Sequence, residues 1–411
     1  MITILDWNEA DESACAAALT RPAVGASRRQ RERVAEIIAD VRVRGDEALF
    51  ELTEEIDRVS LKTLAVDASE LTAAADALTD QQKDAIRSAA NNIEAFHARQ
   101  RPAEIDIETM PGVRCQRVVR PLPSVGLYVP AGTAPLPSTA LMLGIPARLA
   151  ACPTRVLCCP PRPDGQIDPA VLFAAQTAGI DRIFKVGGAQ AIAAMAYGTE
   201  SIPKVCKVFG PGNSWVTEAK TQVDLDPDGA SKDYPAGPSE VMVIADDAAN
   251  PAFVAADLLS QAEHGADSQS ILVTTSRALA ERVLASVDEQ IGLLERSAIV
   301  SESLAHAVII VVETVDQAVA IANRYAPEHL ILQLEAARRW LDSIESAGSV
   351  FVGPWTPESV GDYCSGTNHV LPTYGYASRY SSLGLGDFLR TMTVQELSTD
   401  GLKAIGPIAT T

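Results

Sequence analysis

The sequence predicts an α/β protein with two doubly wound parallel sheets in tandem, and three observations support this fold class. Short runs rich in β-branched residues alternate with helix-length segments, which is typical of strands joined by crossover helices. The series occurs twice, before and after the loop D-G-A-S-K-D-Y-P-A-G-P-S-E. The chain has 411 residues, of which 47% are hydrophobic, so it can form more than one core.

A helical region precedes both series. Over residues 28–101 the apolar side chains recur at helical spacing, as Val34 and Ile37 do, and Ala-rich charged stretches follow them. We therefore expect a helical arm over residues 28–126, and we expect it to join the second α/β domain.

The first series predicts strands at V-G-L-Y-V-P, T-R-V-L-C-C-P, D-R-I-F-K-V-G-G and K-V-C-K-V-F-G-P-G, with helices over 141–150 and 168–178, from 190 and from 213. The second predicts strands at E-V-M-V-I-A-D, S-Q-S-I-L-V-T-T-S, H-A-V-I-I-V-V-E, E-H-L-I-L-Q-L and G-S-V-F-V-G, with helices over 251–262, 277–294, 315–324 and 335–346. The expected division is an N-terminal segment (1–27), the helical arm (28–126), a first α/β domain (127–238), a second α/β domain (239–378) and a tail (379–411). We expect this tail to cover or link other parts.

Composition excludes several classes of protein. Lys and Arg number 34 against 53 Asp and Glu, and the net charge of −19 argues against a nucleic-acid partner. The longest uncharged stretch, 121–147, contains six prolines and three glycines, so we expect no membrane span. The acidic N-terminus does not have the form of a secretory signal, which predicts a cytoplasmic protein. Seven cysteines without a C-x-x-C pair predict reduced thiols.

No dinucleotide fingerprint G-x-G-x-x-G is present, and G-x-x-x-x-G-K-[ST] is absent too. Two glycine-rich turns, K-V-G-G-A-Q-A-I-A-A and V-F-G-P-G-N-S-W, each follow an expected strand and open a helix. Free N–H groups at such a helix start can bind an anion. An ordinary tight turn has the same spacing, and the spacing alone favours it.

Two pairs of polar residues lie at expected helix ends. Gln261 and His264 lie three apart, so both side chains leave one helix face. Imidazole is the commonest metal ligand and Gln an unusual one, so a solvated helix end is the favoured alternative. Glu328 and His329 lie between a helix and a strand, where acid/base residues are often displayed. The alternative interpretation of Glu328 and His329 is that one of them is a surface charge and the other is a capping group.

A third cluster lies in the long loop after the last expected strand. It is rich in Gly, Pro, Ser and Tyr, and loops of this kind near a sheet end are often functional. This loop supplies Asp362 and His369. Either residue could be a metal ligand, or it could form a turn by hydrogen-bonding its own backbone. The remaining histidines, His97 and His306, are expected to be structural.

Taken together, these segments resemble the histidinol dehydrogenase family, zinc-dependent enzymes of histidine biosynthesis. The resemblance runs in order from about residue 118 to about 398, through G-L-Y-V-P-A-G-T-A-P-L-P-S-T-A-L-M-L, V-G-G-A-Q-A-I-A-A, F-G-P-G-N, P-A-G-P-S-E-V, L-L-S-Q-A-E-H-G, Y-A-P-E-H-L-I and G-D-Y-C-S-G-T-N-H-V-L-P-T. It implies four-electron oxidation of L-histidinol to L-histidine through histidinaldehyde, with two NAD consumed in succession. It also implies incomplete Rossmann-like domains, which would explain the absent fingerprint.

Matched motif by motif, the resemblance implies Gln261, His264 and Asp362 as zinc ligands. A zinc ion so held can position the substrate against the nicotinamide. The resemblance further implies that His329 is the general base and that Glu328 activates water.

The same matching implies that Ser239 contacts the substrate together with the zinc ligands and His329. Tyr128, Gln190 and Asn213 match positions that contact NAD in the family.

The resemblance also implies a homodimer, because the family's fourth zinc ligand is a histidine on the partner subunit's C-terminal tail. No histidine follows His369 in this sequence, so we expect an incomplete ligand set that holds zinc weakly. Two other functions stay open: a zinc-dependent hydrolase in which Glu328 activates water, and a non-catalytic ligand-binding relative on the same fold. A thiol mechanism through Cys364 also stays open.

Overall fold

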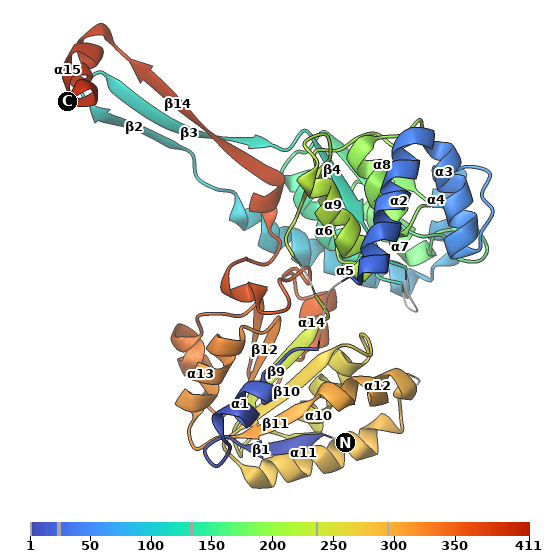
Figure 1. The fold of residues 1–411 in the computed structure, drawn as a ribbon, viewed down its shortest axis with the longest axis vertical. Helices are drawn as coiled ribbons and strands as arrows, with labels where there is room; N and C mark the ends of the chain where they lie inside the picture. The colour runs from blue at the N-terminus through green and yellow to red at the C-terminus, as the bar shows by residue number, and fades with distance from the viewer. Residues whose placement is uncertain (1, 23–25, 132–134, 236, 295) are drawn as a thin grey trace. The chain divides into compact units, whose positions relative to one another are not determined.

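A computed structural model describes the chain except for residues 1, 23–25, 132–134, 236 and 295 (Figure 1). Residues 132–134 belong to the G-L-Y-V-P-A-G-T motif, and that part of it lies outside the described residues. The chain forms two compact units, each with its own parallel sheet. Unit 1 comprises Met1–Arg33, Asn213–Glu218 and Tyr234–Ser382, and unit 2 comprises Val34–Gly212, Ala219–Asp233 and Leu383–Thr411.

The sheet of unit 1 has six parallel strands in the order β1-β11-β10-β9-β12-β13 (Figure 1). They are β1 (Thr3–Asp6), β9 (Glu240–Ala245), β10 (Gln269–Thr274), β11 (Val308–Val311), β12 (His329–Gln333) and β13 (Ser349–Val352). Numbered by their order in the chain, the last five strands lie across the sheet in the order 3-2-1-4-5. This is the Rossmann order without its sixth strand. Strand β1, from the N-terminal segment, occupies the edge beside β11.

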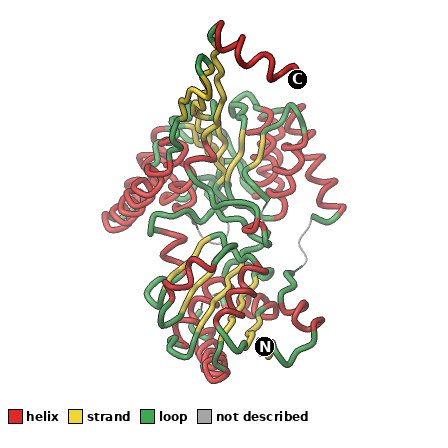
Figure 2. Tube along the Cα trace, turned by 90° about the vertical axis from the view of Figure 1, so that its left-hand side faces the viewer, coloured by secondary structure: helices red, strands yellow, loops and turns green. Residues whose placement is uncertain are grey.

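Helices cover both faces of this sheet (Figure 2). On one face α10 (Pro251–Ala262), α11 (Arg277–Ile291) and α12 (Ser297–Ser303) pack against side chains such as Val243 and Leu272. On the other, α13 (Val315–Tyr325) packs against Ile244 and Val273, and α1 (Glu12–Ala18) adds its C-terminal end. Because both faces are covered, β9, β10 and β12 are buried along their whole length.

Unit 2 contains a five-stranded parallel sheet in the order β6-β5-β4-β7-β8. Its strands are β4 (Ser124–Tyr128), β5 (Thr154–Cys158), β6 (Arg182–Phe184), β7 (Lys207–Phe209) and β8 (Ser231–Lys232). The helices of this series are α6 (Pro137–Leu149), α7 (Pro169–Thr177), α8 (Gly188–Tyr197) and α9 (Ser214–Leu225). Numbered along the chain, these strands again lie across the sheet in the order 3-2-1-4-5. Both sheets are therefore Rossmann-like, and both lack the sixth strand.

The expected helical arm differs in its packing. Its helices are α2 (Arg28–Arg44), α3 (Asp46–Leu52), the π-helix η1 (Thr53–Asp57), α4 (Ala68–Ala77) and α5 (Asp80–His97). Helices α4 and α5 pack against α7 and α6 of the first α/β series, whereas we expected contact with the second. Polar contacts accompany this packing: Arg148 of α6 pairs with Glu94 of α5 at 3.0 Å, and the guanidinium of Arg87 lies 5.4 Å from the ring centre of Phe173.

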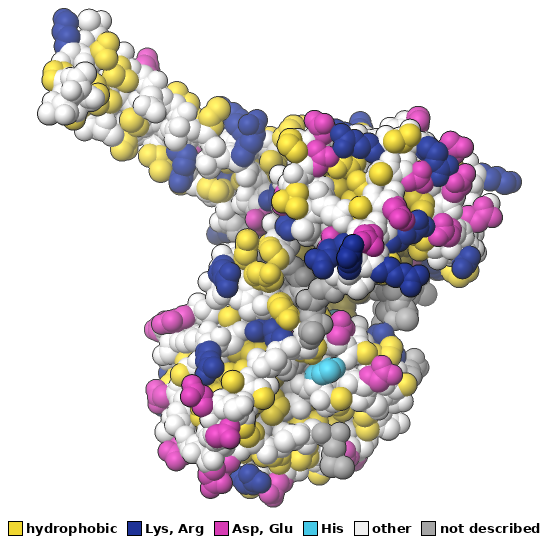
Figure 3. All heavy atoms as spheres, in the orientation of Figure 1, with side chains coloured by type: hydrophobic (Ala, Val, Ile, Leu, Met, Phe, Trp, Pro, Cys, Tyr) yellow, Lys and Arg dark blue, Asp and Glu magenta, His cyan; other side chains and the backbone are white. Residues whose placement is uncertain are grey.

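The sequence reading missed a three-stranded antiparallel sheet in unit 2. It consists of β14 (Leu389–Leu397), β3 (Val113–Pro121) and β2 (Ile105–Met110), in that order, and α15 (Thr399–Thr410) follows β14. Figure 1 shows these strands as a long ribbon that extends away from the parallel sheet of the same unit, with α15 at its far end. Because β2 and β14 are exposed along nearly all their residues, they lack the alternation of buried and exposed side chains that identifies a strand. Hydrophobic side chains are visible along this ribbon in Figure 3.

Two smaller features complete the fold. The segment 335–346, expected to be an α-helix, is the 3₁₀ helix η4 (Ala337–Ser343). Other short 3₁₀ helices are η2 (Ala98–Gln100), η3 (Leu304–His306), η5 (Tyr376–Ser378) and η6 (Leu385–Phe388), and the short helix α14 (Glu358–Tyr363) follows β13. Among the described residues, none of the helices has the length and apolar character needed to cross a membrane.

Candidate active site

A cluster of buried titratable residues lies at the amino ends of β9 and β12 in unit 1. Helix α13 ends at Tyr325, Ala326 takes a left-handed conformation with φ of 53°, and Pro327 prevents the helix from continuing. This sharp reversal places Glu328 immediately before β12 and His329 as its first residue. Ligands of open α/β sheets generally bind at the carboxyl ends of the strands, so this cluster lies at the opposite edge.

His329 is held at both ring nitrogens and is only 2% exposed. Nδ1 lies 3.2 Å from the backbone oxygen of Glu240, and Nε2 lies 3.1 Å from Oδ1 of Asp362. The backbone oxygen is an acceptor, so Nδ1 donates to it; Nε2 donates to Asp362 when the ring is protonated and can accept a proton when the ring is neutral. Burial by itself lowers the pKa of His329, but the carboxylates of Glu328, Asp362 and Glu358 raise it well above its ordinary value.

Glu328 is equally enclosed, with 4% exposure. Its Oε2 accepts a hydrogen bond of 3.0 Å from the backbone N–H of Glu240 and lies 3.6 Å from Nδ1 of His329. Burial raises the pKa of Glu328 to about 8, although the charge of His329 and the hydrogen bond from Glu240 oppose this rise. A carboxyl group that titrates near neutral pH can both accept and release a proton there.

Gln261 and His264 come from the C-terminal end of α10, as the sequence predicted. The side chain of Gln261 is fully buried, and its amide oxygen and nitrogen have no hydrogen-bond partner among the described residues. Nδ1 of His264 lies 3.1 Å from the backbone oxygen of Ser260, while Nε2 faces Asp362 at 3.9 Å from Oδ2. A carbonyl on Nδ1 is the usual support for a histidine that binds a metal through Nε2.

Glu358 is a member of this cluster that the sequence reading missed. One ligand atom each of His264, Glu358 and Asp362 lies within 4.8 Å of the others. Glu358 has no exposed surface, neither carboxylate oxygen has a hydrogen-bond partner among the described residues, and Oε1 lies 3.8 Å from Nδ1 of His329. Burial raises its pKa to about 8. Its position four residues before Asp362, on one face of α14, was the available signal.

These side chains fit a divalent metal ion of the zinc type. Gln261 offers an amide oxygen whose burial without a partner is otherwise unfavourable. His264 offers an oriented imidazole, and Asp362 offers a carboxylate whose pKa the nearby His329 lowers despite the opposing effect of burial. Zinc accepts nitrogen and oxygen donors of this kind.

Two further sequence-predicted residues lie close by in the chain. Ser239 directly precedes β9, and its backbone oxygen accepts a hydrogen bond of 3.3 Å from the N–H of Gln269. Burial lowers the pKa of His369, against the charge of Asp362, which raises it. His369 therefore belongs to the same electrostatic cluster.

The three residues matched to cofactor contacts lie in other parts of the chain. Tyr128 ends β4 and is 3% exposed, and its hydroxyl accepts a hydrogen bond of 3.1 Å from the N–H of Gly188. Gln190 in α8 is fully buried, and its amide atoms have no hydrogen-bond partner among the described residues. Asn213 is exposed and caps α9 by accepting from the N–H groups of Trp215 and Val216.

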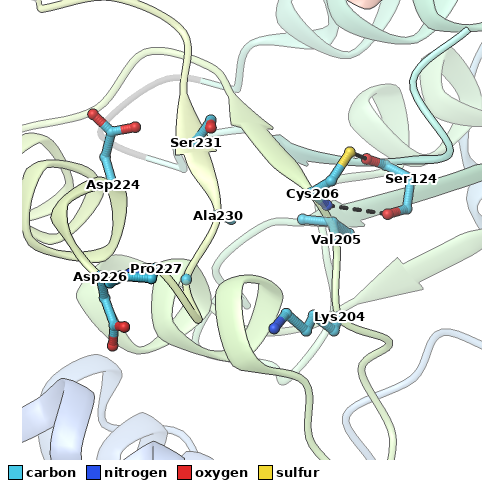
Figure 4. Close-up of a pocket in the computed structure, with 10 residues that line it drawn as sticks. Ser124, Lys204, Val205, Cys206, Asp224, Asp226, Pro227, Ala230 and Ser231 are labelled. Carbon is cyan, nitrogen blue, oxygen red and sulfur yellow. Dashed lines mark hydrogen bonds between the residues drawn. The ribbon is translucent and has the colours of Figure 1, made fainter.

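Unit 2 also contains a pocket of about 510 Å³ that none of these residues lines (Figure 4). Cys206 and Ser124 form part of its wall, with the Cys206 N–H donating to the Ser124 hydroxyl at 3.0 Å. Asp224 and Asp226 lie on the other side of the pocket. It lacks an acid/base pair of the kind found in unit 1.

The fold and the site together define an α/β enzyme in which an acid/base pair adjoins side chains able to bind a metal ion. A family model described as histidinol dehydrogenase matches residues 20–411. The chain therefore belongs to the histidinol dehydrogenase family, oxidoreductases of histidine biosynthesis.

Individual relatives agree with this assignment. The chain is 53% identical to the histidinol dehydrogenase of Yersinia pestis, over 97% of this chain and 89% of that protein. It is 55% identical to that of Xanthomonas axonopodis pv. citri (strain 306), over 99% of this chain and 94% of that protein. The crystal structure of histidinol dehydrogenase from Elizabethkingia anophelis superposes with a TM-score of 0.94 at 46% identity, covering 99% of this chain and 93% of that chain. The family resemblance drawn from the motifs is confirmed, and an oxidoreductase family decides against the hydrolase alternative.

Proposed function

We propose that this protein oxidises L-histidinol to L-histidine through histidinaldehyde, in two successive NAD-dependent steps that share one site. The observation that carries the proposal is the arrangement of Glu328 and His329, two buried proton-transfer groups, beside Asp362, which lies in one cluster with His264 and Glu358. This arrangement combines groups that move protons with groups that can hold a polar substrate through a metal ion.

Gln261, His264 and Asp362 would hold the zinc ion. When bound there, zinc supplies a Lewis-acidic template that can take the imidazole and amino nitrogens of histidinol. The unpartnered buried amide of Gln261 and the carbonyl on Nδ1 of His264 support these assignments. Ser239, directly before β9, would add a hydroxyl contact to the substrate.

His329 would act as the general base. Its Nδ1 is occupied by the backbone oxygen of Glu240, so Nε2, which faces Asp362 and the ligand cluster, is the nitrogen that accepts the alcohol proton. As the first residue of a buried strand, His329 has little freedom to move away. This rigidity favours proton transfer because the base stays in its productive position.

Glu328 would assist the second oxidation, in which water must add to the aldehyde. A pKa of about 8 in the buried site lets its carboxylate take a proton from water at neutral to weakly basic pH and release it afterwards. Its hydrogen bond from the Glu240 N–H leaves the other carboxylate oxygen for water.

Tyr128, Gln190 and Asn213 would contact NAD, whose chemistry is to accept hydride. Tyr128 ends β4 beside β7, where the strand order 3-2-1-4-5 reverses direction, and nucleotides bind at such switch points. The buried amide of Gln190, which has no hydrogen-bond partner among the described residues, supplies a polar group for such a ligand.

The proposal is tested by following NADH absorbance when NAD is added with histidinol or with histidinaldehyde. His329→Asn should abolish most oxidation of both substrates, since proton removal serves both steps. Glu328→Gln should spare alcohol oxidation and slow aldehyde oxidation. Exposed His306 and Glu302 of the same unit provide matched controls, and His306→Asn and Glu302→Gln should leave both rates unchanged.

Equal losses on both substrates in the Glu328 and His329 variants would contradict the division of roles. Absence of NADH formation by the unaltered protein, with zinc supplied, would favour the non-catalytic relative instead.

A further inference from the structure

One residue outside the predicted site contacts both members of the acid/base pair through its backbone. Glu240 is the first residue of β9, and its N–H donates to Oε2 of Glu328 at 3.0 Å. Its backbone oxygen accepts from Nδ1 of His329 at 3.2 Å. The position of this single peptide segment therefore sets the orientation of both side chains.

The side chain of Glu240 is clamped in turn by Arg21, from the N-terminal segment. Nε of Arg21 lies 2.6 Å from Oε2 and Nη2 lies 2.9 Å from Oε1, which is a two-pronged pairing. The two side chains are 14% and 2% exposed. Burial lowers the pKa of Arg21, but its hydrogen bond to Glu240 raises it, and the net shift is upward. The guanidinium therefore carries its charge.

Arg21 also binds the end of helix α13. Nη2 donates to the backbone oxygen of Tyr325 at 2.7 Å and lies 3.4 Å from that of Ala326. The guanidinium lies 3.7 Å above the centre of the Tyr325 ring. Since this helix end leads directly into Glu328, Arg21 connects the segment that bears the acid/base pair with the segment of Glu240.

The Tyr325 hydroxyl closes the network. It lies 3.0 Å from Oε2 of Glu240 and 2.7 Å from Oε1 of Gln269, the first residue of β10, and its single proton is shared between these acceptors. The network thus ties together the amino ends of three neighbouring strands, β10, β9 and β12.

We propose that Arg21 and Glu240 are positioning residues of the acid/base pair: their ion pair holds the Glu240 backbone where it orients both Glu328 and His329. A buried ion pair contributes little net stability, because desolvation of the two charges offsets their attraction. Supporting the geometry of catalytic groups is a use that such a network serves well. This inference rests on the roles proposed above for Glu328 and His329.

The test separates positioning from folding by comparing single and double variants. Arg21→Met leaves the Glu240 carboxylate buried without its partner, so both thermal stability and kcat should fall. Arg21→Met combined with Glu240→Met removes both charges, and its melting temperature should recover because no unpaired charge remains. If the ion pair between Arg21 and Glu240 positions the acid/base pair, kcat of the double variant stays reduced by about 10-fold or more. Its zinc affinity and its KM for histidinol should change little. Arg21→Lys, which cannot make the two-pronged contact, should lie between Arg21→Met and the unaltered protein in kcat.

The control is the exposed ion pair between Arg282 and Asp247, just beyond the carboxyl end of the same strand, with 3.1 Å between Nη2 and Oδ1. Arg282→Met combined with Asp247→Met should leave kcat unchanged. If kcat of the Arg21/Glu240 double variant recovers together with its melting temperature, the Arg21–Glu240 ion pair has only a structural role and the inference is overturned. If Arg21→Met does not fold, the double variant and Arg21→Lys decide by the same comparison.

Failure of the proposed function gives a different result. If His329→Asn leaves NADH formation unchanged, the role of the acid/base pair is wrong. If His329→Asn abolishes activity while the Arg21/Glu240 double variant has unaltered kcat, only the positioning role is wrong.

Discussion

A methyl group at Gly361 should disturb the metal site more than the fold. Gly361 lies in α14, immediately before Asp362, and a Cβ at this position would stand 2.4 Å from Cε1 and 2.8 Å from Cζ of Phe351. Phe351 is 4% exposed and belongs to the core beneath β13, so its ring cannot swing aside easily. Carbon atoms in contact prefer a separation of about 3.5–4.0 Å, so the Gly361→Ala variant must shift α14 or the ring by about 1 Å.

The expected size of the effect follows from this displacement. Overpacking a core by one methyl group costs about 1–3 kcal/mol of unfolding free energy. A shift of α14 moves Asp362, while a shift of Phe351 moves a ring whose centre lies 5.9 Å from that of His329. A misplacement of about 1 Å can reduce catalysis by roughly 10²-fold. Loss of support for a metal ligand typically reduces metal affinity by about 10–100-fold.

Three measurements on Gly361→Ala check this reasoning: urea unfolding, competition for zinc against a chromogenic chelator, and NADH formation from histidinol. Gly386→Ala is the control, because no atom outside its two chain neighbours lies within 4 Å of a Cβ built there. It should match the unaltered protein in all three. A Gly361→Ala variant with undiminished zinc affinity and kcat/KM would refute the packing argument, whatever its stability.

Three other predictions concern pH, metal and assembly. Burial raises the pKa of Asp257 to about 6 from 3.8. The stabilising contribution of this carboxyl group is therefore present below pH 3.8 and is lost as the pH rises through 6. In urea unfolding between pH 5 and pH 8, the unaltered protein should lose about 1.4 kcal/mol more unfolding free energy than Asp257→Asn. Replacing the unpartnered amide in Gln261→Leu should weaken zinc binding measured by chelator competition while preserving thermal stability without metal, and a parallel loss of both would indicate a structural role. Sedimentation velocity at micromolar concentration should show a homodimer, and a monomer would contradict the assembly that the family resemblance implies.

Local patterns accounted for the parallel sheets and for parts of the site. The apolar runs at β9, β10 and β12 are continuous because both faces are buried, and such runs stand out against the helices between them. Glu328 and His329 are adjacent in the chain, and the proline before them marks the boundary between helix and strand. Motif matching then added the family, which the comparisons confirm.

Other features could not be read from local patterns. Strands β2 and β14 are exposed on nearly every residue, so their sequence carries no buried stripe, and β14 pairs with β3 across a long separation in the chain. Glu358 was not predicted from the sequence, and its complete burial beside His329 marks it as part of the site.

The sequence by itself determined the two α/β series, most of their strands and helices, and the family to which the chemistry belongs. Periodicity and motif order carry this information because they depend on neighbours close in the chain. Only the tertiary structure decided that Arg21 reaches Glu240, and that the Glu240 backbone holds both Glu328 and His329. These contacts depend on the parallel alignment of β9 with β12 and on the path of the N-terminal segment, which bring together residues as much as 305 positions apart.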